Sequence, residues 1–493
     1  MSDRMTEVTR PRTALAVLCA ASFLAVIDTT IVNIALPTIG RELGASIEGL
    51  QWIITGYTLT LAALILLGGS LGDRYGRRRV FLIGVVWFAV ASLLCAIAPS
   101  IAILIVARML QGIGGALLTP GSLALIQASF HPDDRGRAVG AWSGLGGVAA
   151  ALGPFLGGWL IAGPGWRWAF LINLPVAAAV VLVTLRHVPE SRDEEATGSF
   201  DVLGAVLGST ALAALTYALI RAGDGGPTSI WVGALGVALS VAFVLVERSR
   251  ATAMVPLDVF SSRQFTAVNI VTFAVYAALG GISFVLLLQL QVVAGYTPLA
   301  AGAALLPFTV LMLLLSSRAG ALAQRIGPRW PMTIGTALAA GGVLLLSRIG
   351  PDSSYVGTVL PAATVYGLGM SITVAPLTAT VLATAEVRHA GVASGVNNAV
   401  ARAASLLAVA ALPALVGLTG EEYENPTALS AAFRTAMWIC AGGLALGSLL
   451  SLVTIRDDAL RPTPDRPVVP RPQRQIHCAI DATPLERQPV TRA

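Results

Sequence analysis

The sequence contains no lysine and little charge of either sign. Charged residues make up 12% of its 493 positions and hydrophobic residues 55%, whereas about a quarter of a soluble globular domain is charged. So few charges cannot cover the surface of a soluble fold. The composition therefore argues against a soluble enzyme and indicates a membrane protein.

Cysteine and histidine are also scarce, with four of each. Cys19, Cys95 and Cys440 lie in apolar segments and Cys478 lies near the C-terminal end, without paired or metal-ligand spacing. We therefore expect no disulfide, metal site or cofactor. The net charge of +6 comes from arginines in short polar gaps between apolar segments. This is not a nucleic-acid-binding stripe, so we expect no nucleic-acid partner.

Long apolar segments fill most of the chain. A bilayer core of roughly 30 Å requires about 20 apolar residues of helix, and fourteen segments meet this requirement, which predicts an all-α membrane protein. The first contains Asp28 and is longer than a signal-peptide core, so we expect it to stay in the mature protein. The segments are 14–36, 51–70, 80–98, 101–127, 138–161, 168–185, 202–220, 229–246, 265–294, 299–317, 331–347, 355–385, 391–419 and 435–455.

The arginines indicate the orientation, because cytoplasmic loops accumulate positive charge. With the N-terminus inside, 25 of the 32 arginines fall in cytoplasmic segments and five in outside loops. Arg108 and Arg402 lie inside spans. We therefore expect both termini in the cytoplasm of a multi-pass cell-membrane protein. The four histidines also fall in cytoplasmic segments, which excludes a histidine relay within the membrane.

A short motif recurs in the two halves. Residues 69–78 follow the pattern G-x-L-x-D-R-x-G-x-R, and residues 320–329 follow it with Gln324 in place of Asp73. This predicts two six-helix bundles related as parallel repeats, at 1–190 and 261–455, with inserted helices 7 and 8 at 191–260 and a disordered cytoplasmic tail at 456–493. The alternative is chance recurrence in an arginine-rich chain.

Polar residues, glycine and proline form further motifs in the first half. These are D-T-T-I-V-N-I-A-L-P at 28–37, R-x-x-Q-G-x-G-G-A at 108–116, G-P-x-x-G-G at 153–158 and W-R-W-A-F-L-I-N-x-P at 166–175. Together with 69–79, they resemble the fourteen-helix drug:proton antiporter branch of the major facilitator superfamily. The resemblance covers essentially the whole membrane region, although its most specific motifs lie in the first half.

The resemblance implies proton-driven export by alternating access. It implies that the 69–79 motif is a gate contact with the other half, and we assign this role to Asp73, Arg74, Gly76 and Arg77. It also implies an exporter motif in the fifth span, where ordinary small-residue packing is an alternative. The exporter-motif residues are Gly153, Pro154, Gly157 and Gly158. Because Gln324 departs from the pattern, no gating role is carried over to the second copy.

Ionisable residues within the spans are costly and are candidates for function. At 1.5 Å per residue, Asp28 and Arg108 both lie roughly 20 Å from the cytoplasmic face. We therefore expect them to be neighbours and to couple transport to protons. Burial favours the neutral acid, Arg108 favours the ionised form, and motion that separates them would change proton affinity. The alternative is a permanent structural ion pair.

Other polar residues in the spans are candidates for lining the substrate path. Arg402 would either bind an anionic group or brace its helix, and Asn397 lies beside it. For the others, hydrogen bonding between packed helices is the alternative. The candidates are Asn33, Gln111, Tyr276, Gln289, Asn398 and Arg402, with Asn269 and Gln291 as further ones.

These observations predict a secondary transporter, not an enzyme, since no catalytic cluster has a membrane-compatible placement. Its expected partners are the bilayer, protons and a small neutral, amphipathic or singly charged substrate. We expect a monomer. Uptake or facilitated diffusion of a metabolite on the same fold is the alternative function.

Overall fold

A computed structural model describes residues 11–129, 148–149, 152–192, 201–250, 260–351, 353–384, 390–420 and 422–460. Within these ranges the regular structure is helical. The elements are α1 (Pro11–Leu43), α2 (Ile47–Tyr75), α3 (Arg77–Ala96), α4 (Ile101–Ser129), α6 (Trp168–Leu171), α7 (Asn173–His187), α8 (Val202–Ile220), η1 (Arg221–Asp224), α9 (Pro227–Ser249), α10 (Arg263–Leu288), η3 (Gln289–Val293), α11 (Pro298–Ala304), α12 (Leu306–Ile326), α13 (Arg329–Leu346), η4 (Tyr355–Val359), α14 (Leu360–Thr384), α15 (Ala390–Leu415), η6 (Glu422–Glu424), α16 (Pro426–Thr454) and η7 (Asp457–Leu460).

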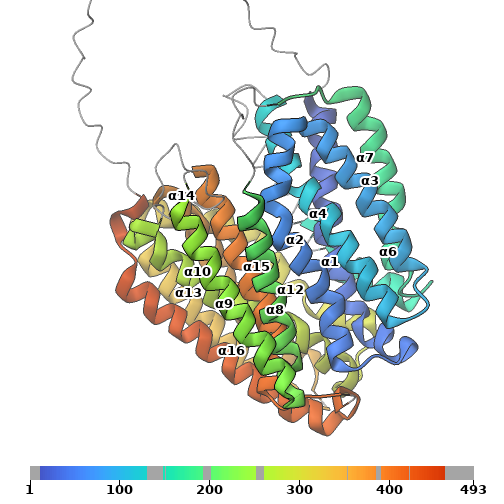
Figure 1. The fold of residues 1–493 in the computed structure, drawn as a ribbon. Coiled ribbons are helices and arrows are strands. Elements are labelled where there is room, and N and C mark those ends of the chain that lie inside the picture. The colour runs from blue at the N-terminus through green and yellow to red at the C-terminus, as the bar shows by residue number, and fades with distance from the viewer. Residues whose placement is uncertain are drawn as a thin grey trace, which may run out of the picture. The chain divides into compact units, whose positions relative to one another are not determined.

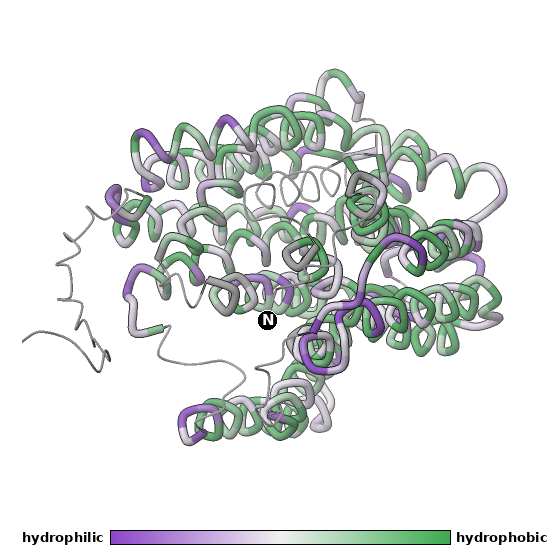
Figure 2. Tube along the Cα trace, turned by 90° about the horizontal axis from the view of Figure 1, so that it is seen from above, coloured by the Kyte–Doolittle hydropathy of each residue, from purple (hydrophilic) through white to green (hydrophobic). Residues whose placement is uncertain are grey.

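Most of these helices are long enough to cross a bilayer. Twelve spans in the described residues meet the length and hydropathy requirements, and α2, which bends between Ile65 and Leu67, makes thirteen. Hydrophobic residues dominate the helix trace (Figure 2). Half of the fifth predicted span, 138–161, lies outside the described residues, which include 148–149 and the helix Leu152–Ala162. The count of fourteen therefore stays a prediction, as does the disordered tail, since 461–493 also lie outside them.

The described helices pack in two groups joined by a pair (Figure 1). The N-group comprises α1–α4, α6 and α7, and the C-group comprises α10–α16. We count the helix Leu152–Ala162 with the N-group because its Gly153 and Gly157 face α1. Helices α8 and α9 pack against each other, and α8 also contacts α2 and α15, one helix from each group. The middle pair thus lies against both groups.

The repeated motif forms the same turn twice. The sequence placed 69–79 in a loop, but α2 continues to Tyr75 and only Gly76 separates it from α3. Gly76 has φ +109° and its N–H bonds to the carbonyl of Gly72, while Gly327 has φ +93° and bonds in the same way to Ala323. Both values of φ favour glycine.

Each of these glycines has one acidic residue beside it. That residue follows the last helix of the same group. The carboxylate of Glu190, just after α7, accepts hydrogen bonds from the N–H groups of Arg78 (2.9 Å) and Arg79 (3.2 Å) at the start of α3. A Cβ added at Gly327 would lie 2.7 Å from Cβ of Asp457, just after α16. The two turns therefore share their backbone form and the position of an acidic neighbour.

The two groups are bonded to each other at one end. This end, called here the α1–α2 end, holds the turn between those helices. Here Tyr423 Oη donates to the Ala45 carbonyl at 2.8 Å and the Ile47 N–H donates to the Gly420 carbonyl at 2.8 Å. All the hydrogen bonds between the groups that join two described residues lie toward this end, away from the α2–α3 turn.

We predict that Gly327→Ala lowers thermal stability, because a side chain there meets both a left-handed backbone and Asp457. The backbone alone costs about 1–2 kcal/mol. Gly442→Ala is the control, since Gly442 lies in α16 with open space around its Cα. Thermal unfolding of the two purified proteins in one detergent checks this, and equal losses in both would contradict it.

Candidate functional site

A buried carboxylate in the middle of α1 is the centre of a polar network. Asp28 is 0% exposed and Arg108 of α4 is 1% exposed. Arg108 Nη1 lies 2.5 Å from Asp28 Oδ2. The structure thus brings together the two residues that the depth argument predicted to be neighbours.

Two amides complete the shell of Asp28. Gln111 Nε2 donates to Asp28 Oδ1 at 2.8 Å, and Asn173 Nδ2 of α7 donates to the same oxygen at 3.0 Å. Both amides also donate to Ser92 Oγ of α3, at 2.8 and 3.2 Å. Together with Arg108, Asp28 accepts from three donors, one of which is charged.

Aromatic rings enclose the guanidinium of Arg108. It lies 4.3 Å from the ring centroid of Tyr57 and 5.8 Å from that of Phe170. Arg108 Nε donates to the Ile53 carbonyl at 3.2 Å. The cation is therefore held by a carboxylate, a carbonyl and two ring faces, which offsets part of the cost of its removal from water.

A cavity lies on the other side of α1, between the N-group and the C-group. Its volume is about 160 Å³, and Thr30, Asn33 and Pro154 line it from the N-group. Helices of the C-group contribute mainly aliphatic side chains, with Ser283 and Tyr366 among the few polar ones. Asp28 points away from this cavity into the N-group, so α1 separates the carboxylate from it.

The sequence profile described as Major Facilitator Superfamily matches residues 18–409 and 268–490. The chain belongs to the major facilitator superfamily. It is 37% identical over 398 residues to the "Multidrug resistance protein Stp" of Mycobacterium tuberculosis, covering 79% of this chain and 73% of that protein. It is 38% identical over 404 residues to the "Puromycin resistance protein pur8" of Streptomyces alboniger, covering 81% and 80%.

Solved structures share this superfamily fold at low identity. A POT family transporter in complex with a thioalcohol-conjugated peptide has a TM-score of 0.67 and 14% identity, covering 89% of this chain and 95% of that one. A bacterial homologue of the human lysosomal transporter Spinster has a TM-score of 0.63 and 16% identity, covering 94% and 100%. The superfamily is one of membrane transporters, not enzymes.

The 69–79 motif of the superfamily makes contacts within the N-group. Asp73 Oδ1 accepts from Arg77 Nε at 2.8 Å, and the Arg77 N–H donates to the Ser191 carbonyl at 2.8 Å. Arg74 is exposed, with its guanidinium 5.9 Å from the Tyr75 ring centroid. The gate contact with the other half that the resemblance implies is thus not seen for Asp73 and Arg77 in their described contacts.

The glycine-proline motif lies where the fifth span meets two neighbours. Gly153 faces Thr30 and Gly157 faces Ile31, both of α1, while Gly158 faces Leu299 of α11. Pro154 lines the cavity, and its carbonyl lies against Gly302 of α11. The small residues therefore allow close packing at a contact between the two groups.

The predicted lining residues separate into two sets. Asn33 lines the cavity, and Arg402 lies on α15 with its Nε donating to Asn398 Oδ1 at 3.1 Å. Tyr276 of α10 is partly buried and packs against the hydrophobic core.

The other predicted lining residues are placed differently. Gln111 belongs to the Asp28 shell, not to a cavity wall. Gln289 is 0% exposed and donates to the Ile349 carbonyl at 2.8 Å, within the C-group. Asn397 likewise donates to Thr272 Oγ1 at 2.8 Å. Hydrogen bonding of this kind within the bundle was the alternative to a role in lining the substrate path. An amide deep in a bundle must find a partner.

Four side chains of the site have no role in the sequence-based prediction. Asn173 and Phe170 lie in the 166–175 motif without an assigned role, and Ser92 and Tyr57 lie outside the motifs. Asn173 carried a usable signal, since an amide in an apolar span needs a partner. A serine in a helix often bonds to a nearby backbone carbonyl, and an aromatic ring in an apolar span is a common core residue, so neither gives such a signal.

We predict that Asp28→Asn destabilises the protein by about 3–5 kcal/mol, because it leaves the buried charge of Arg108 without its counter-ion. The double variant Asp28→Asn, Arg108→Gln removes both charges and should recover much of this loss. Thermal unfolding of the wild type, both single variants and the double variant measures the coupling. Additive losses would show that the two side chains do not stabilise each other.

Proposed function

We propose that this protein is a proton-coupled antiporter of the cell membrane that exports small amphipathic compounds by alternating access. The Asp28–Arg108 pair carries the proposal, because it is a protonatable group in the middle of a transport fold. The relatives named for drug resistance support the direction and the class of substrate. We propose fourteen helices in two six-helix bundles with an inserted pair, acting as a monomer with both termini in the cytoplasm.

The hydrogen bonds between the N-group and the C-group indicate which conformation of the transport cycle the structure represents. The arginine distribution makes the α1–α2 end the outer end, and this is the end at which hydrogen bonds join the groups. The conformation then has its outer end closed. In our proposal the motif residues Asp73, Arg74, Gly76 and Arg77 contact the C-group when the inner end closes.

The state of Asp28 fits this cycle. In the outer-closed conformation Asp28 is bonded to Arg108 and two amides, and in our proposal its proton has already left toward the cytoplasm. When the outer end opens, a proton from outside would neutralise Asp28 and release Arg108. Since α1 also lines the cavity through Thr30 and Asn33, its movement would link proton uptake to release of the substrate.

The cavity suggests a substrate with an aromatic ring and a hydrogen-bond acceptor. Phe308 and Tyr366 stack beside it with ring centroids 5.0 Å apart, and such faces bind planar rings. The phenol oxygen of Tyr366 is buried and has no hydrogen-bond partner in the described part of the chain. A carbonyl or similar acceptor on the substrate would satisfy it. Arg402 does not line this cavity and is proposed as a separate contact for an anionic or electron-rich group.

The test of transport is the resistance profile of a host with and without the gene, with a protonophore as control. We predict increased resistance to several amphipathic antibiotics, and accumulation of the compounds once the proton gradient is collapsed. Asp28→Asn at normal membrane levels should abolish resistance. Proton-coupled export by that variant would contradict the coupling role, and accumulation driven by the wild type would favour uptake.

We predict that Tyr366→Phe weakens export of quinone or ketone compounds by roughly tenfold, because one hydrogen bond is lost in a dry site. Export of compounds without an acceptor should change little, and thermal stability should not fall. Tyr217→Phe on α8 is the matched control. Concentration dependence of efflux from loaded cells measures both classes, and an equal effect on both would remove the proposed contact.

A further inference from the structure

Two glutamines join the N-group to the C-group through backbone carbonyls. Gln51 of α2 is 1% exposed, and its Nε2 donates to the carbonyls of Val409 at 2.8 Å and Ala410 at 2.9 Å, both on α15. In the opposite direction, Gln291 Nε2 of η3 donates to the Ile34 carbonyl of α1 at 3.0 Å. Each amide thus ends on the main chain of the other group.

A proline explains why one of these carbonyls is free to accept. Pro413 lies within α15, four residues after Val409. Since proline has no N–H, the carbonyl four residues before it lacks its helical donor. Pro37 of α1 has the corresponding effect on the carbonyl of Asn33, four residues before it, and not on that of Ile34. In a membrane, a carbonyl without a donor is costly, and here the partner group supplies the donor.

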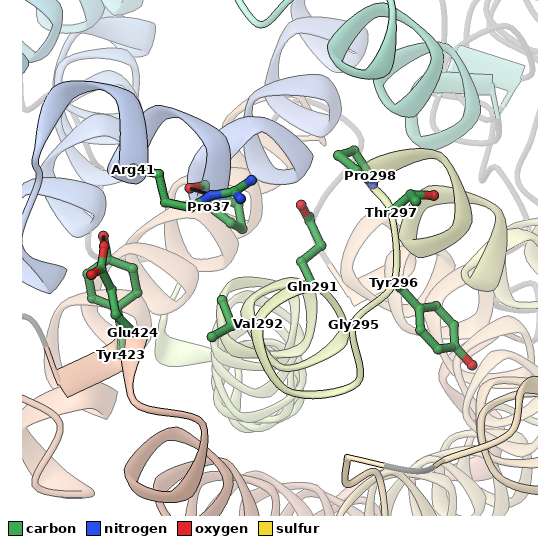
Figure 3. Close-up of a pocket in the computed structure, with 10 residues that line it drawn as sticks. All are labelled: Pro37, Arg41, Gln291, Val292, Gly295, Tyr296, Thr297, Pro298, Tyr423 and Glu424. Atoms are coloured by element: carbon green, nitrogen blue, oxygen red, sulfur yellow. Dashed lines mark hydrogen bonds between the residues drawn. The ribbon is translucent and has the colours of Figure 1, made fainter.

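The two contacts differ in their access to water. Gln291 and Pro37 line an open pocket of about 520 Å³ together with Arg41, Tyr423 and Glu424 (Figure 3). Water in this pocket can compete for the Ile34 carbonyl. Gln51 is buried, so its two bonds have no such competitor and are the stronger ones.

We propose that Gln51 is a latch that holds the outer end closed, with Gln291 as a weaker second latch. The inference rests on the proposed function, since only a carrier that alternates needs such a contact. A carbonyl freed by proline suits this role because it has a partner in both states. Gln51 donates a hydrogen bond to this carbonyl when the outer end is closed, and water that enters donates one when that end opens.

Access to the cavity from outside tests the latch without measuring transport. In a transport-competent variant with alanine at all four native cysteines, Ser283→Cys places a reporter on the cavity wall. A membrane-impermeant maleimide is added to intact cells and the labelling rate is measured. Gln51→Leu should raise this rate by roughly tenfold, because two hydrogen bonds are lost, and Gln291→Leu by less. The control Gln324→Leu, exposed near the opposite end, should not change it.

A second substitution separates a latch from a general structural role. Pro413→Ala restores an N–H that can serve the Val409 carbonyl within α15, so Gln51→Leu should add little to the labelling rate in that background. Additive effects, or unchanged labelling in a folded Gln51→Leu protein, would overturn the proposal. If Gln51→Leu does not fold, Gln51→Asn keeps the amide but shortens its reach and is read by the same criteria.

The labelling and resistance experiments fail independently. If the wild type confers no resistance but Gln51→Leu still speeds labelling, the export proposal is rejected and the latch is kept. Normal resistance with unchanged labelling would reject the latch alone.

Discussion

The hydrocarbon interior offers no water to polar groups, so each buried charge or amide must be satisfied by the protein itself. Asp28 meets this requirement with three donors from two neighbouring helices, and Arg108 with a carboxylate, a carbonyl and two aromatic faces. The network draws on α1, α2, α3, α4, α6 and α7. It therefore joins most of the N-group at mid-depth, and a change in its charge affects how these helices pack.

The same constraint gives glycine and proline their positions. Glycines in the fifth span let α1 and α11 approach closely, and Gly76 and Gly327 allow turns that a side chain would disturb. Proline has the opposite effect, because it leaves a carbonyl without a donor and so creates an acceptor within a helix. Val409 shows the consequence, since its carbonyl is bonded to a side chain from the other group.

The sequence was most informative where a residue type is costly to place within the membrane. A carboxylate and an arginine in apolar spans are costly enough that their depth alone predicted the Asp28–Arg108 contact. Gln289 and Asn397 were equally visible, but an amide is satisfied as well by a neighbouring helix as by a ligand, so sequence could not place them. Gln51 gave no such signal, because its partners are backbone carbonyls of α15, 358 and 359 residues further along the chain. Helix ends were also uncertain, since α2 continues through polar residues to Tyr75.

Helix α1 connects the separate parts of the site. Asp28 faces the N-group network, Thr30 and Asn33 face the cavity, and the Ile34 carbonyl is bonded to Gln291 of the C-group. Six residues separate Asp28 from Ile34, a distance of roughly 9 Å along the helix. A rigid helix segment of this length cannot move at one point without moving at the others. Loss of the Arg108 bond, a change in the cavity wall and strain on an outer latch would therefore follow from one displacement of α1. In the proposed transport cycle, this movement of α1 would connect proton binding at Asp28 directly to the gate, without a longer chain of intermediates.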